Sequence, residues 1–228
     1  MIKKAVRKIF KAILYFFAIS VLSVIIFRFV PIPVTPLMII RCIEQKWNGK
    51  NIKLKKDWVS LKKISTAMPL AVIAAEDQKF EEHFGFDMEA IKKAENYNKK
   101  HHGKRMKGAS TISQQTAKNV FLWPNRSWIR KGFEVYFTFL IEFFWSKQRI
   151  MEVYLNVIEM GNGVYGIETA AQEYFHKPAS KLSVREASLI AAILPSPIKW
   201  SPVKPNARVQ KKASRIIHFI SRLKLEDF

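Results

Sequence analysis

Two acidic side chains in apolar surroundings are the first candidates for catalysis. Glu76 follows the apolar run of residues 70–75, and Glu134 lies among the aromatic residues of 133–139. A carboxyl at the edge of an apolar stripe is partly desolvated, and desolvation moves a carboxyl pKa toward a range that suits a general base. By itself, Glu76 also fits an ordinary surface acid on an amphipathic helix, and Glu134 also fits a structural ion pair.

The surroundings of Glu76 add further polar candidates. Residues 65–83 predict one helix, in which Glu76, Phe80 and His83 share a face at about 100° per residue and Asp77 lies beside them. His83 alone is more typical of a structural hydrogen-bonding residue than of a catalyst. This face is the first predicted site.

Residues 108–119, GASTISQQTAKN, combine a helix start with polar side chains and a cation. The pattern from Thr111 to Gln114 fits a capping box, and the helix that follows would place Gln114 and Lys118 on one face. Helix N-termini with nearby cations bind anions. The segment therefore predicts an anion site of Ser110, Thr111, Gln114, Gln115 and Lys118, although a well-capped surface helix shares part of this pattern.

The third candidate group surrounds Glu134. Arg130 and Lys131 precede it by four and three residues, so both cations can pair with its carboxylate on a helix. A buried acid needs such partners. Two separated carboxylates with cations between them suit sugar chemistry on a charged donor.

Taken in order, these three segments resemble motifs of the peptidoglycan glycosyltransferase family, which includes bifunctional penicillin-binding proteins and monofunctional biosynthetic transglycosylases. SKQRIMEVYLN at 146–156 and GVYGIETAAQEYF at 163–175 resemble two further motifs. The resemblance covers about residues 58–220. RFVPIPVTPLMIIR, which follows the apolar N-terminus, resembles the monofunctional Gram-negative branch. Five motifs in one order are far more specific than any single one.

The resemblance implies a reaction on lipid II, a disaccharide carried by undecaprenyl diphosphate. The 4-hydroxyl of one disaccharide attacks the anomeric carbon of the growing strand, which inverts, and the lipid diphosphate leaves. The resemblance implies that Glu76 is the general base and Glu134 a second essential carboxylate. It implies that Lys118 and Arg126 contact phosphate. Lys93 falls where an arginine is expected, and lysine lacks the bidentate fork that arginine offers to phosphate.

The cations of this site would replace a general acid. A diphosphate leaves readily when cations meet its developing charge, so one base and a cluster of cations suffice. No cofactor or protein metal site is predicted, because no ligand cluster is visible. A divalent cation, if one takes part, would bridge the phosphates of the substrate.

The N-terminus predicts a membrane anchor. Five cations within the first 11 residues precede an uncharged run from Ala12 to Phe27, and extension to Val30 gives about the 20 residues that cross a bilayer. A cleaved signal peptide is the alternative, but the run is long for one and prolines follow it. The N-terminal charges should stay in the cytoplasm. We therefore expect a single-pass inner-membrane protein with a periplasmic catalytic domain.

The expected organisation is a basic tail (1–11), a transmembrane helix (12–30), a juxtamembrane linker (31–57) and a glycosyltransferase domain (58–228). Helical periodicity and scarce strand-like alternation predict a mainly α fold. Residues 128–145 predict a core helix rather than a second span, because two glutamates inside it are costly in lipid. A capping box at 183–186 and a basic amphipathic helix at 208–225 follow. The resemblance implies a lysozyme-like helical lobe and a small jaw lobe that faces the membrane.

A net charge of +21 indicates an anionic partner. Nucleic acid is scarce outside the cytoplasm, which leaves lipid II, the growing lipid-linked glycan strand and anionic lipids, with other cell-wall synthesis proteins as further candidates. A lytic peptidoglycan-cleaving enzyme would not need the gathered cations, and a wall-binding scaffold would not need two placed glutamates. Two S-x-x-K matches lack a K-T-G partner, so no transpeptidase activity is expected. The single Cys42 excludes an intramolecular disulfide.

Overall fold

The computed structural model describes residues 2–101, 106–125 and 127–222. Helices dominate these ranges, which confirms the prediction of a mainly α fold. The α-helices are α1 (Ile2–Phe27), α2 (Pro36–Trp47), α3 (Ala67–Glu76), α4 (Met88–Lys100), α5 (Ile112–Phe121), α6 (Trp128–Phe144), α7 (Lys147–Val157), α8 (Ile167–Phe175), α9 (Val184–Ile193) and α10 (Ala207–Ile220).

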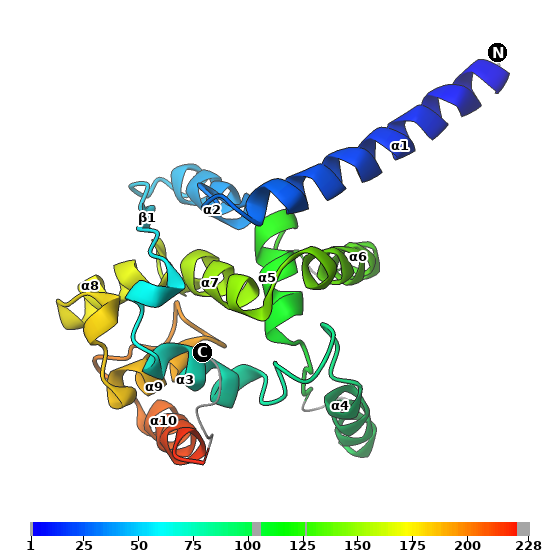
Figure 1. Cartoon of the computed structure of the whole chain (residues 1–228). Helices are drawn as coiled ribbons and strands as arrows, with labels where there is room; N and C mark the ends of the chain where they lie inside the picture. The colour runs from blue at the N-terminus through cyan, green and yellow to red at the C-terminus, as the bar shows by residue number, and fades with distance from the viewer. Residues whose placement is uncertain (1, 102–105, 126, 223–228) are drawn as a thin grey trace.

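Helix α1 projects from the helical body as a long rod (dark blue in Figure 1). Within the described residues, Lys3–Phe27 is the one helical stretch long and apolar enough to cross a membrane. The helix ends at Phe27, three residues before the predicted end of the span at residue 30 and ahead of Pro31. The predicted linker is not simply extended chain, because it contains α2. Pro36 lies in the first turn of this helix, and the Thr35 hydroxyl accepts a hydrogen bond from the Met38 amide.

A small sheet joins the segment after α2 to the rest of the domain. Its strands are β1 (Lys55–Lys56), β2 (Glu159–Gly161) and β3 (Val164–Tyr165), in the order β1-β3-β2. Strand β1 pairs with β3 in parallel, and β2 pairs with β3 antiparallel. Gly163 has a φ of 68°, and a Cβ there would lie 2.3 Å from the Lys53 carbonyl oxygen, so this close approach requires glycine.

Two groups of helices form the core. Helix α3 packs against α9 and α10, and α5 packs against α6 and α7. Residues 67–74 of α3 are all buried, which explains why this short helix is apolar on every side. In Figure 1, α4 stands to one side of these groups. The C-terminal end of α3 meets the N-terminal end of α5 between these two groups of helices. The candidate site lies at this meeting point.

One helix prediction is wrong in its extent. The helix expected over residues 65–83 ends at Glu76, and Asp77 leaves the helical region with φ −157° and ψ 82°. Its side chain accepts hydrogen bonds from the Ile112 amide and from His83, so tertiary contacts end the helix here. Phe80 and His83 therefore do not continue the helical face of Glu76. The helix expected over 128–145 is α6, and those expected at 183 and 208 are α9 and α10.

Candidate active site

Glu76 is the last residue of α3, and helices distant in sequence hold its carboxylate. Its side chain is 16% exposed. Oε2 accepts a hydrogen bond from Nε2 of Gln115 on α5 at 3.1 Å. Oε1 lies 3.3 Å from Nζ of Lys212 on α10. The carboxylate therefore has one orientation, set by an amide on one side and a cation on the other.

Tyr154 on α7 fixes the orientation of the Gln115 amide. Its hydroxyl donates to Oε1 of Gln115 at 3.4 Å, so the amide nitrogen faces Glu76. Tyr154 is 1% exposed. Burial, and then the charges of Glu76 and Asp77, raise the pKa of Tyr154 well above its ordinary value. The hydroxyl consequently keeps its proton and its role as donor.

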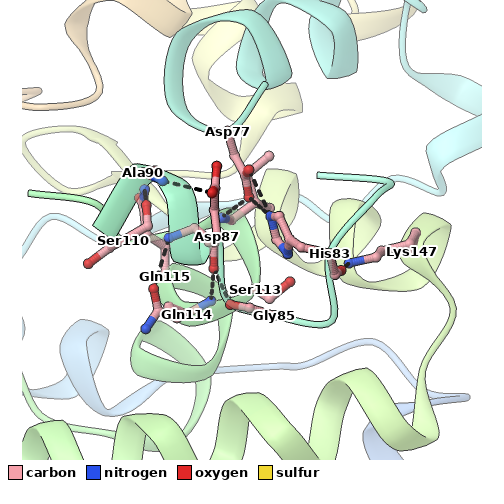
Figure 2. A network of polar contacts seen from close by, with 12 residues as sticks. Asp77, His83, Gly85, Asp87, Ala90, Ser110, Ser113, Gln114, Gln115 and Lys147 are labelled. Carbon is pink, nitrogen blue, oxygen red and sulfur yellow. Dashed lines mark hydrogen bonds and ion pairs between the residues drawn. The ribbon is translucent and has the colours of Figure 1, made fainter. Parts of the chain in front are cut away.

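Asp77, the residue after Glu76, is buried and pairs with His83 (Figure 2). His83 Nε2 lies 2.9 Å from Oδ1 of Asp77, and the Ile112 amide donates to Oδ2 at 3.0 Å. The Asp77 side chain is 2% exposed. It therefore ties the segment after Glu76 to the start of α5. Phe80, which was predicted to belong to the same site, is fully buried, and its role at the site stays a prediction.

The predicted capping box at the start of α5 is confirmed. Thr111 Oγ1 accepts from the Gln114 amide at 3.2 Å, and Gln114 Oε1 accepts from the Thr111 amide at 3.0 Å. The Thr111 hydroxyl donates to the Gly85 carbonyl at 2.7 Å. Because Asp77 takes the Ile112 amide, the amides of Ile112 and Gln114 are both occupied by the protein's own side chains. These two amides are therefore paired within the protein, and the predicted anion site stays a prediction.

A hollow of about 300 Å³ opens beside Glu76, and its lining includes Lys93, Ser110 and Thr111. A second hollow of about 850 Å³ shares Ser110 with the first and includes Gln114 and Lys131. Their common wall is the 108–110 segment. Half of the fourteen predicted site residues therefore line one or both of these hollows, namely Glu76, Asp77, Lys93, Ser110, Thr111, Gln114 and Lys131.

Lys118 lines two smaller hollows, of about 180 and 190 Å³, together with Asn119 and Leu37. The first of these includes Gln115 and Tyr154, so it adjoins the other side of the group that holds Glu76. Lys93, on the rim of the first hollow, has a 73% exposed side chain and pairs with Glu89 at 2.5 Å. Arg126 lies outside the described residues.

Glu134 is buried between the cations predicted to pair with it. Its side chain is 4% exposed, with Arg130 Nη1 at 2.7 Å and Lys131 Nζ at 2.5 Å. Arg130 is itself buried, whereas the Lys131 side chain is 38% exposed and reaches the second hollow. The prediction of the ion pairs is confirmed. Lys131 links the buried carboxylate to the open surface.

Lys212 was not predicted as a site residue. The sequence indicated only that its helix is basic and amphipathic. It lies three residues after Val209 and four before Ile216, both buried, so it flanks the apolar stripe of α10. A cation at the edge of this stripe lies close to a helix that packs against α10, and one such helix is α3. The spacing within α10 therefore indicates that Lys212 borders the buried face of its helix. The sequence does not show that its partner is Glu76.

Within residues 2–101, 106–125 and 127–222, no three His, Cys, Asp or Glu side chains come together as a metal-binding group. The site offers cations, amides and hydroxyls, which are donors to phosphate and sugar oxygens. A proton acceptor lies among them in the form of Glu76. The arrangement suits deprotonation of a hydroxyl next to an anionic substrate.

Comparisons with known proteins agree with this chemistry. A family model described as Transglycosylase matches residues 45–221. A biosynthetic peptidoglycan transglycosylase of Bacteroides thetaiotaomicron is 54% identical over 220 residues, covering 96% of this chain and 88% of the relative. Proteins of the same name from Bdellovibrio bacteriovorus (54% identical, 93% and 84% covered) and Pseudomonas entomophila (49% identical, 98% and 94% covered) are also similar. The chain therefore belongs to the transglycosylase family.

Proposed function

We propose that this protein is a peptidoglycan glycosyltransferase that polymerises lipid II into β-1,4-linked glycan strands. The family membership and the names of the relatives, which are biosynthetic peptidoglycan transglycosylases, support this reaction. The observation that carries the site assignment is the Glu76 carboxylate, held between Gln115 and Lys212 beside a hollow with a lysine on its rim. A lytic enzyme or a non-enzymatic scaffold is not favoured by these relatives.

In the proposed mechanism, Glu76 accepts the proton of the acceptor 4-hydroxyl. The hydroxyl oxygen then forms a bond to the anomeric carbon of the donor, and the bond from that carbon to the diphosphate breaks with inversion. Undecaprenyl diphosphate leaves with the electron pair. Lys118 and Arg126 meet its charge, so no strong general acid is needed.

Glu134 acts differently from Glu76 in this proposal. It is buried and paired, so it does not exchange protons with substrate. Its charge balances Arg130 and Lys131, and it holds Lys131 at the second hollow. Lys131 can then contact the donor as a positioned cation. The two carboxylates are a base and a structural anion.

The proposed location is the inner membrane, with the N-terminus in the cytoplasm and residues 58–228 in the periplasm. The single candidate span of the described chain supports an anchor at 12–30. Helix α6 packs along α1 and exposes Trp128, Ile129, Phe139 and Phe143, apolar side chains that suit contact with lipid. Anionic lipids would attract the basic surface, and other cell-wall synthesis proteins are further proposed partners.

One paired assay tests the function. Detergent-solubilised protein is incubated with labelled lipid II and, separately, with intact peptidoglycan sacculi. The proposal expects polymeric glycan from lipid II and no soluble fragments from sacculi. Fragments without polymer would mean that the enzyme is lytic, and neither product would favour a scaffold.

The topology has its own test. A reporter that is active only outside the cytoplasm, fused at the C-terminus, should be active, and the mature protein should retain its first 30 residues. A shortened N-terminus would show that a signal peptide is removed instead.

A further inference from the structure

The C-terminal end of α1 is bonded to the catalytic domain. Nε1 of Trp145 donates to the Val24 carbonyl at 2.8 Å. Arg149 donates to the Phe27 carbonyl from both Nε (3.1 Å) and Nη2 (2.7 Å), and from Nη2 to the Val30 carbonyl at 2.6 Å. Side chains of the α6–α7 region therefore hold several carbonyls at the point where the anchor leaves the membrane.

These bonds meet a physical need of the helix end. The last carbonyls of a helix have no partner within it, and a cation nearby complements the negative end of the helix dipole. The Arg149 side chain is 13% exposed and also pairs with Glu152 at 2.5 Å. One guanidinium thus joins two carbonyls at the end of the anchor to α7 and pairs with Glu152 on α7 itself, a set of contacts that suits the planar, five-donor fork of arginine.

Apolar packing surrounds the same joint. Val24 on α1 and Ile32 just after it are fully buried within the hydrophobic core of the domain. Lys56 Nζ donates to the Ile32 carbonyl at 2.7 Å. Ser20 and Tyr136 hydroxyls lie 2.7 Å apart further along the helix. The anchor is therefore packed as part of the domain over its last two turns.

Helix α7 connects this joint to the candidate site. It carries Arg149 near its start and Tyr154 five residues later. Tyr154 orients the Gln115 amide that holds Glu76. The direction of the anchor and the orientation of the base are consequently set by one short, buried helix.

We propose that Arg149 is a positioning residue that locks the catalytic domain at one angle on its membrane helix. This rests on the proposed function. The lock fixes the height and direction of the Glu76 hollow relative to the bilayer. A substrate whose diphosphate is held at the membrane surface then meets the base without a search over domain orientations, which is a form of pre-organisation.

The variant Arg149→Lys keeps the charge and removes the fork. Two spin labels in full-length protein in liposomes report the angle directly, one at Lys11→Cys on α1 and one at Glu95→Cys on α4, with Cys42→Ser to remove the native thiol. The parent should give one narrow distance distribution, and Arg149→Lys a broad one. Arg185→Lys, on the exposed face of α9, is the matched control and should leave the distribution narrow.

Polymerisation gives the second measurement. With lipid II in bilayers, Arg149→Lys should be slower by about tenfold, the factor that corresponds to one lost charged hydrogen bond. With a water-soluble, short-chain analogue of the substrate the rate should match the parent, because the angle to the membrane no longer matters. A general structural defect would slow both reactions equally.

An unchanged narrow distance distribution in Arg149→Lys, or equal loss on both substrates, would overturn the proposal. Trp145→Phe, which removes the indole N–H donor to Val24 together with part of a buried ring, is the second variant if Arg149→Lys fails to fold, and the same outcomes apply to it. If the parent makes no polymer, the proposed function fails, whereas the distance measurement still decides whether the lock exists.

Discussion

Replacing Glu134 by Gln should destabilise the protein as well as inactivate it. The Glu134 side chain is 4% exposed and Arg130, its partner at 2.7 Å, is 11% exposed, so the substitution leaves a buried guanidinium without its anion. Breaking a buried pair costs about 3–5 kcal/mol, and the amide oxygen of Gln still accepts one hydrogen bond, so we expect the lower end. About 3 kcal/mol corresponds to a melting temperature lower by about 6–12 °C for a chain of this size.

The assay is thermal unfolding of the solubilised protein beside polymerisation of lipid II. Glu95→Gln is the matched control, because Glu95 forms an i,i+4 pair with Lys99 at 2.6 Å but its side chain is 57% exposed. This variant should melt like the parent. The double variant Arg130→Met with Glu134→Met should recover part of the lost stability without recovering activity. A Glu134→Gln protein that melts at the parent temperature would refute the reasoning.

Three further changes probe other parts of the site. Gly85→Ala should lower the free energy of unfolding by about 1–3 kcal/mol in denaturant unfolding, because the φ of Gly85 is 78° and a Cβ there would lie 2.7 Å from Thr138. Gly132 has open space around its Cβ position, so the control Gly132→Ala should stabilise α6 by about 0.5–1 kcal/mol. Burial raises the pKa of Glu159 in the folded protein above its ordinary value of 4.5. Protonation of this carboxyl therefore favours the folded state, and that contribution to stability is lost as the pH rises from 4.5 through the raised pKa. Glu159→Gln should therefore raise the melting temperature at about pH 7 and leave it unchanged near pH 4, and no difference between the two pH values would contradict this. Lys118→Ala should weaken productive use of lipid II by about 1.5–3 kcal/mol in kcat/KM, and a parent-like kcat/KM would remove its phosphate role.

Sequence patterns predicted helix starts and ion pairs well where the two interacting residues lie within one helical turn of each other. The capping boxes at Thr111 and Ser183 were predicted because both partners lie within four residues. The pairing of Glu134 with Arg130 and Lys131 follows equally from helical spacing. Two glutamates within residues 128–145 were enough to predict a core helix instead of a second span.

The errors arose where long-range contacts override local preference. Nothing near Asp77 in sequence shows that its carboxylate takes the amide of Ile112, 35 residues later, and so ends α3. For the same reason the turn that buries Phe80 could not be foreseen. Lys212 reaches Glu76 across 136 positions, which periodicity within α10 cannot reveal. The sequence therefore predicted contacts within one element more reliably than contacts between elements distant in the chain.

The central claim is that Glu76 is the base of the polymerisation reaction, and Glu76→Gln tests it most directly. Gln keeps the shape of the side chain but cannot accept a proton at neutral pH. The account predicts that polymerisation of labelled lipid II falls by about 10²–10⁴-fold. It also predicts a melting temperature close to that of the parent, because the Glu76 side chain is partly exposed. Glycan made by Glu76→Gln at a rate near that of the parent would contradict the account.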